Sequence, residues 1–131
     1  MGIFLARDKD CYSSRKEEIS KMLSLEEGLV AFEAKDYTKA FELLKPIAEQ
    51  GDAEAQCIIA NMYHLGLGLD RNGSEAIRWY ISSAEKGYGV ASNNLAEIFR
   101  VGSCNVAPDQ AEAEKWYHKA REQGFLHTRL P

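Results

Sequence analysis

The amino-acid sequence predicts an all-α protein, a superhelix (solenoid) of about three helix pairs preceded by a short N-terminal helix. Three observations predict this fold. The chain repeats itself at a period of 36 to 37 residues, apolar residues within each repeat recur at helical spacing, and glycines stand where helices should end. The 131 residues suffice for one such domain, and 45% apolar with 27% charged residues is typical of a folded globular chain.

The repeat is clearest between the middle and the last third of the chain. A shift of 36 residues places Ala60 on Ala96, and a shift of 37 places Trp79-Tyr80 on Trp116-Tyr117. The extra residue falls in the segment before Asp109, which we expect to be a loop, where an insertion is tolerated. A backward shift of 36 finds a shorter unit that opens the array.

A capping-box pattern at Ser14-Arg15-Lys16-Glu17, with apolar residues at helical spacing after it, predicts a leading helix before the array. This helix is either separate from the next one or continuous with it. The residues before it are weakly patterned. The expected parts are a mobile N-terminus at 1–14, a leading helix at 15–24, a repeat domain at 25–126 with repeats at about 25–51, 52–87 and 88–124, and a tail at 127–131.

Each repeat should contain two helices joined by a loop. Asn72 and Asp109 can each cap the start of a second helix, and a glutamate three residues later completes the capping box. Asp36 offers the same cap in the first unit, without the acidic partner. Gly66 can take the positive φ that ends a first helix. Pro46 falls inside a second helix, where we expect a kink rather than a stop.

The second helices carry the expected core. Ala76 and Ala113 each precede a Trp-Tyr pair by three residues, and a small residue beside large ones lets two helices approach closely. Aromatic pairs can also stack a ligand. Their recurrence at one repeat position favours core packing instead.

These motifs together resemble the Sel-one-like repeat, a subclass of the tetratricopeptide-like solenoids, over about residues 25–124. The run from Gly28 to Gly51 is similar to the shorter opening unit common in such chains. Cys104-Asn105 departs from the pattern, because it replaces the second loop glycine of the third unit. The residues that carry the resemblance in the second repeat are Gly66, Gly68, Leu69, Ala76, Trp79, Tyr80 and the run Ala84-Glu85-Lys86-Gly87.

Charge and composition exclude several classes of function. Sixteen Lys and Arg against twenty Asp and Glu give a net charge of −4, which removes the basic field that a nucleic-acid-binding protein needs. No stretch approaches the ~20 apolar residues of a membrane span. The apolar run at the N-terminus is too short for the core of a signal peptide. We therefore expect a cytoplasmic protein without a nucleic-acid or membrane partner.

The sequence shows no constellation of reactive residues. A phosphate-binding loop would follow a strand, whereas Gly66-Leu67-Gly68 follows an expected helix. The residues that could bind a metal share no metal-ligand spacing on one helix face; they are His64, His118, His127, Cys11, Cys57 and Cys104. We expect no metal, no cofactor and no catalytic residue, and hence no enzyme.

The expected function is the binding of another protein or peptide. The opening helices of successive units in a solenoid line a shared concave face, which can hold an extended peptide or a helix. With Tyr63 and Phe99 turned inward, the row that remains on these helices is the candidate binding face, and a plain solvated helix face is the alternative. Its members are Glu54, Cys57, Asn61, His64, Val90, Asn93, Glu97 and Arg100.

The resemblance implies a non-catalytic adaptor or regulator, with family roles in bacterial signalling, secretion and effector neutralisation. An immunity-type inhibitor of a toxin or effector is a narrower alternative. Cysteine-rich relatives imply a hydrolase as another alternative, but Ser82 and Ser83 stand in the region where those relatives carry a paired cysteine. Because no further helix covers the last repeat, we also consider a homodimer through this uncovered C-terminal end.

Overall fold

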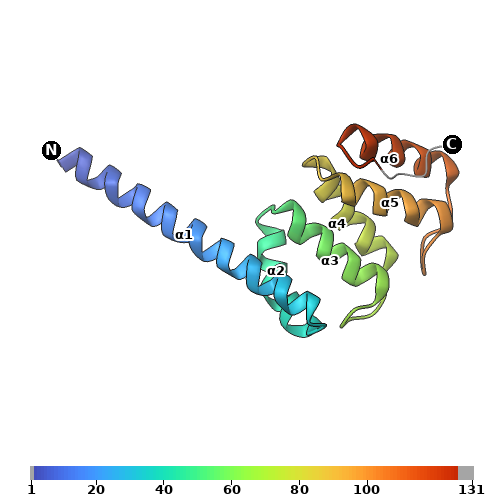
Figure 1. The fold of residues 1–131 in the computed structure, drawn as a ribbon, viewed down its shortest axis with the longest axis horizontal. Coiled ribbons are helices and arrows are strands. Elements are labelled where there is room, and N and C mark those ends of the chain that lie inside the picture. The colour runs from blue at the N-terminus through green and yellow to red at the C-terminus, as the bar shows by residue number, and fades with distance from the viewer. Residues whose placement is uncertain (1, 127–131) are drawn as a thin grey trace.

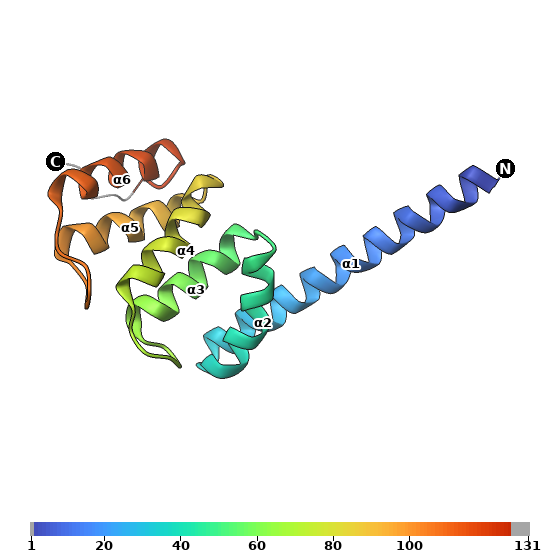
Figure 2. The ribbon, with the colours of Figure 1, turned by 180° about the vertical axis from the view of Figure 1, so that it is seen from behind.

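A computed structural model describes residues 2–126, and within them it contains six α-helices and no β-strand. Each odd-numbered helix packs against the even-numbered helix that follows it, and that helix packs against the next pair (Figures 1 and 2). The predicted all-α solenoid of three helix pairs is therefore confirmed. The helices are α1 (Gly2–Glu33), α2 (Tyr37–Glu49), α3 (Ala53–Leu65), α4 (Gly73–Glu85), α5 (Gly89–Val101) and α6 (Gln110–Glu122).

The second helix of each pair begins at the cap that the sequence predicts. The Asp36 carboxylate accepts a hydrogen bond from the backbone N–H of Lys39 at 3.3 Å. The Asn72 and Asp109 side chains each accept from the backbone N–H three residues later at 3.1 Å. These bonds satisfy amide donors that the helix itself leaves unpaired. They fix where α2, α4 and α6 start.

Gly66 and Pro46 bear on where the helices end, while the kink expected at Pro46 stays a prediction. Gly66 ends α3 in the left-handed region, with φ of 69°, as predicted. The helix α2 continues through Pro46 to Glu49, so the proline does not stop it.

The core consists of two clusters of buried side chains that follow the stack. One cluster joins the end of α1 to α2 and α3, and the other joins α3 through α6. Tyr80, Trp116 and Tyr117 are buried, which confirms the core role predicted for the aromatic pairs. Trp79 is half-buried and packs against both clusters, so it links them.

The first helix is longer than the sequence indicates. The expected leading helix at 15–24 is continuous with the opening helix of the array, and the helix also includes residues 2–14. The absence of a clear apolar pattern there hid this extension from sequence reasoning. Its N-terminal part projects away from the stack (Figures 1 and 2). The predicted mobility of 1–14 stays a prediction, and the predicted tail at 127–131 lies outside the described residues.

Close packing of α1 on α2 depends on a glycine. A Cβ atom at Gly28 would lie 2.5 Å from the Leu44 side chain, well inside van der Waals contact. The side chain of Leu44 is fully buried and occupies the space that Gly28 leaves open. The two helices therefore approach closely at this point.

The outer face of α6 is polar at two positions where α4 is apolar. In α4, Ile77 and Ile81 are half-buried in the cluster that continues into α5. A shift of 37 places Glu114 and His118 of α6 at these positions. The outer face of α6 therefore offers no comparable apolar seat for a second copy of the chain.

Candidate protein-binding groove

A hollow of about 400 Å³ opens where α1, α3, α4 and α5 meet. We call it the groove. The predicted face contributes side chains from α3 and α5, while α1 and α4 add residues that the sequence did not indicate. The residues that line the groove are Phe32, Asn61, His64, Leu65, Tyr80, Asn94 and Glu97.

A hydrogen-bonded cluster connects three helices at the groove. The Tyr80 hydroxyl donates to the side-chain oxygen of Asn61, and the Asn94 amide donates to the same oxygen at 3.2 Å. The Asn61 oxygen therefore has both its lone pairs engaged, while its NH₂ group keeps two donors. Asn61 is thus held in place by α4 and α5 and can present these donors to a ligand.

The next repeat carries an equivalent bond. The Tyr117 hydroxyl donates to one carboxylate oxygen of Glu97 at 2.5 Å, and the Arg100 guanidinium bonds the other oxygen at 2.7 Å. Glu97 lies 36 residues after Asn61, and Tyr117 lies 37 residues after Tyr80. A tyrosine of the second helix therefore anchors a polar side chain of the first helix in both full repeats.

The first repeat has an apolar pair at the same two positions. Shifting Asn61 and Tyr80 back by 36 residues leads to Leu25 and Leu44. Both leucines belong to the core cluster of α1, α2 and α3. Neither leucine lines the groove, to which the first repeat contributes Phe32.

Burial sets the protonation state of the groove at neutral pH. Burial, then the negative charge of Cys57 in its thiolate form, raises the pKa of Tyr80, and a hydrogen bond from Asn94 opposes the shift. Burial and the positive charge of Arg71 lower the pKa of His64. At neutral pH the tyrosine hydroxyl thus stays a donor and the imidazole stays neutral. The charged groups near the groove are the Glu97–Arg100 pair and Arg71, whose guanidinium donates to the backbone carbonyl of His64 at 3.2 Å.

The structure brings three of the eight predicted residues together at the groove: Asn61, His64 and Glu97. The other residues on the same helices differ in exposure. The exposed ones are Glu54 and Val90, and the half-buried ones are Asn93 and Arg100. Whether these residues contact a partner stays a prediction.

The exposure expected of Cys57 is wrong. Only 2% of its surface is accessible, and it belongs to the core cluster that continues into α5. Burial, then the negative charge of Glu54, raises the pKa of its thiol from 9.0 to about 12. A thiol with this pKa stays protonated at neutral pH and is a poor nucleophile.

Sequence reasoning missed four lining residues, of which one had a visible signal. Leu65 is 57% exposed at the end of α3, and Val101, its equivalent 36 residues later, is 57% exposed at the end of α5. An apolar residue at the last position of both opening helices could have been noticed. Phe32, Tyr80 and Asn94 enter the groove through packing between helices, which a single helical pattern does not show.

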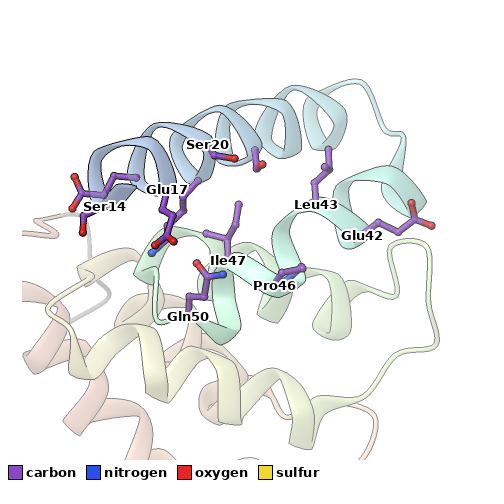
Figure 3. Close-up of a pocket in the computed structure, with 11 residues that line it drawn as sticks. Ser14, Glu17, Ser20, Glu42, Leu43, Pro46, Ile47 and Gln50 are labelled. Carbon is purple, nitrogen blue, oxygen red and sulfur yellow. The ribbon is translucent and has the colours of Figure 1, made fainter. Parts of the chain in front are cut away.

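A second hollow of about 720 Å³ separates the middle of α1 from the C-terminal half of α2 (Figure 3). Leu43, Pro46 and Ile47 of α2 face charged and hydroxyl side chains of α1 across it. In the next pair, the corresponding helix ends are held together, because the Ser83 hydroxyl donates to the Ala53 carbonyl at 2.6 Å. The hollow is therefore confined to the first pair, whereas the groove spans several helices.

Two further properties of the described residues bear on function. Among the residues whose side chains the structure describes, 13–126, no group of three or more His, Cys, Asp and Glu is placed to hold a metal ion. None of the six helices within residues 2–126 is long and apolar enough to cross a membrane.

Comparison with known proteins identifies the repeats. The model of the Sel1 repeat matches three segments of the chain, 22–52, 53–88 and 89–125. The chain is 38% identical over 89 residues to chitin synthase regulatory factor 3 of the fungus Schizosaccharomyces pombe, a match that covers 66% of this chain and 10% of that protein. The similarity is therefore not confined to bacteria.

Two crystal structures have the same architecture. A Sel1 repeat protein from Oxalobacter formigenes superposes with a TM-score of 0.70 at 34% identity, over 76% of this chain and 40% of that one. A protective antigen of uropathogenic Escherichia coli strains that displays an SLR fold superposes with a TM-score of 0.76 at 30% identity, over 84% of this chain and 25% of that one. The chain thus spans less than half of each of these relatives. The three matched repeats and the shared superhelix show that the chain belongs to the Sel1-repeat family.

Proposed function

We propose that this chain is a non-catalytic adaptor or regulator that binds a segment of another protein in the groove. The observation that carries the proposal is the repeated arrangement on α3 and α5. In both helices a tyrosine anchors a polar side chain, Asn61 or Glu97, and an exposed apolar residue follows four positions later. A row of fixed polar groups beside apolar contacts suits a peptide segment.

The groups at the groove have complementary roles in this proposal. The NH₂ group of Asn61 can donate to a backbone carbonyl of the bound segment. The exposed side chain of Leu65, which lines the groove, and that of Val101, just beyond the groove at the end of α5, can contact its apolar residues. Because Tyr80 and Tyr117 hold the polar side chains beforehand, less conformational entropy is lost when a partner binds.

The family supports this function at a coarser level. Sel1-repeat proteins are in general modules for protein interaction and regulation. The name of the fungal relative describes a regulatory factor. A role in regulation through a protein partner is therefore our proposal for this chain also.

The proposal can be tested with the exposed apolar pair. The wild-type chain would be used to capture proteins from its source cell, and the captured partner would be identified by mass spectrometry and purified. We expect Leu65→Glu with Val101→Glu to weaken binding of that partner at least about tenfold, which corresponds to ~1.4 kcal/mol. Both side chains are exposed, so the variant should keep its fold, which circular dichroism would check.

Leu126→Glu is the matched control, because Leu126 is 71% exposed and lies outside the groove. This variant should bind the partner as the wild type does. Equal affinity of the wild type and the Leu65/Val101 variant would refute the groove as the binding site.

A further inference from the structure

The outer face of α1 carries an apolar stripe. Ile19, Met22 and Leu23 are 58%, 63% and 55% exposed, and Val30, two turns further on, is 66% exposed. These positions lie on one side of the helix, at spacings of three, four and seven residues. Gly28, which marks the side that packs on α2, is half a turn away from this stripe.

The repeat register shows what this stripe corresponds to. A shift of 36 places Met22 on Ile58 and Leu23 on Ile59. Ile58 is half-buried and Ile59 is fully buried in the cluster that α3 forms with α2. The stripe is thus the face that packs on the preceding repeat in a solenoid, and nothing covers it within the described residues.

Exposed charges stand on both sides of the stripe. Arg15 and Lys16 lie about one turn before Ile19, and Glu26 and Glu27 lie about one turn after Leu23. Among the described residues, none of these four side chains is in an ion pair. Glu17 and Glu18, which follow the basic pair, line the hollow between α1 and α2 instead. The stripe side of α1 is therefore basic before Ile19 and acidic between Leu23 and Val30.

This distribution of charge favours a second copy of α1 as the partner, in antiparallel orientation. A second α1 in parallel would place like charges opposite each other at both ends of the stripe. A second α1 in antiparallel orientation places the basic end of each copy against the acidic end of the other. The contact is then self-complementary, as a twofold interface requires.

We propose that the chain forms a homodimer in which α1 pairs antiparallel with α1 of a second copy. In this register Ile19 lies opposite Leu23 of the second copy, Arg15 lies opposite its Glu27, and Lys16 lies opposite its Glu26. The alternative of stacking on α6 of another copy lacks support, because the outer face of α6 is polar where α4 has Ile77 and Ile81.

The shape of the molecule allows this pairing. At 1.5 Å per residue, a helix of 32 residues is about 48 Å long. Its N-terminal part extends away from the stack (Figure 1). Two such helices can therefore overlap along the stripe while the two stacks lie at opposite ends of the pair. A shallow hollow of about 390 Å³ beside Leu23 and Val30 gives the second helix a seat.

The test is sedimentation equilibrium of the full chain over a dilution series. We expect the mass to rise with concentration from 14.7 kDa toward twice that value. Arg15→Glu with Lys16→Glu should be monomeric, and so should Glu26→Lys with Glu27→Lys. An equimolar mixture of these two variants should dimerise again, and so should one chain that carries all four substitutions.

A matched control is Glu85→Lys with Glu122→Lys, which changes the net charge as the second variant does, at exposed sites far from the stripe. This control should dimerise like the wild type. Circular dichroism of each variant would verify that the helices are intact. A wild-type chain that stays monomeric at every concentration, or charge variants that dimerise like the wild type, would overturn the proposal.

The orientation has its own readout. A zero-length carbodiimide cross-linker, applied to a mixture of isotope-labelled and unlabelled chains, should join Lys16 of one chain to Glu26 of the other, as detected by mass spectrometry. Cross-links between chains at other positions only would overturn the antiparallel register.

Discussion

At the scale of the residue, Cys57 shows how the environment sets chemistry. The thiol faces the core, where the packing of α5 covers it, so its pKa is raised from 9.0 to about 12. A buried thiol of this kind resists ionisation because the thiolate loses its hydration. The same residue would be an ordinary surface thiol if α3 stood alone.

This shift predicts how stability depends on pH. Because the pKa is higher in the folded state, the folded chain holds the proton when the unfolded chain has lost it. The stabilisation is fully present below pH 9 and is lost as the pH rises toward 12. We expect the free energy of unfolding to fall between pH 9 and 11 by ~1.4 kcal/mol per pH unit more in the wild type than in Cys57→Ala.

Urea unfolding at several pH values would measure both slopes. The comparison uses slopes because the substitution also removes packed atoms and so lowers the stability at every pH. Parallel slopes for the two proteins would contradict the burial of this thiol in the folded state.

The repeat period assigned residues to helices, but it did not show how each helix is rotated about its own axis. Repeat spacing correctly indicated the polar row of α3 and α5 from which Asn61, His64 and Glu97 reach the groove. It could not show that Cys57, on the same row, is covered by the next repeat. It also could not supply Phe32, which reaches the groove only because α1 has a longer C-terminal end than α3.

At the scale of the element, the loop before α6 joins two repeats. The Asn105 side chain accepts a hydrogen bond from the backbone N–H of Ser74 at 3.2 Å and donates to the Asn72 side chain at 3.3 Å and to the Ser74 hydroxyl at 3.1 Å. It thus adds a second cap to the N-terminus of α4 from the following repeat. The departure from the family pattern at Cys104-Asn105 therefore has a structural role.

Removing this cap should destabilise the chain. We expect Asn105→Ala to lower the free energy of unfolding by about 1 kcal/mol, because the Ser74 amide loses its acceptor at a helix end. Cys104→Ala, at the exposed neighbouring position, is the control and should stay within about 0.5 kcal/mol of the wild type. Chemical denaturation measures both values. A loss no larger than that of the control would show that the three bonds contribute little.

The helices themselves were largely predictable, for reasons that differ along the chain. The starts of α2, α4 and α6 follow from Asp36, Asn72 and Asp109, whose side chains cap locally. The sequence has no capping motif at Gly2, and the N-terminal part of α1 projects away from the stack. A helix that is not defined by a cap or by a buried face gives no sequence pattern to recognise.

At the scale of the whole molecule, the two ends of the stack differ. The outer face of α6 is charged, and Lys115 and Lys119 lie over the Trp116 ring at 5.4 and 5.2 Å. Polar outer faces at terminal repeats are what keeps a solenoid soluble. The outer face of α1 instead keeps the apolar side chains of an internal repeat, such as Leu23 and Val30.

Equivalent residues should therefore contribute differently according to their place in the stack. Leu23 and Ile59 occupy the same repeat position, but Leu23 is 55% exposed and Ile59 is fully buried between α2 and α3. Ile59→Ala should lower the free energy of unfolding by about 2–5 kcal/mol, because it leaves a cavity in the core. Leu23→Ala should change it by less than about 0.5 kcal/mol in the monomeric chain.

Urea unfolding, at a dilution at which sedimentation shows a monomer, would measure how much each substitution lowers the free energy of unfolding. The same measurement at higher protein concentration adds a second comparison. If α1 pairs with a second copy, Leu23 becomes buried in the dimer, so the cost of Leu23→Ala should grow with concentration while that of Ile59→Ala stays nearly constant. A cost for Leu23→Ala that is already as large as that for Ile59→Ala at high dilution would mean that the stripe is covered within one chain. That result would contradict the idea that the contribution of a residue to stability depends on its position in the stack.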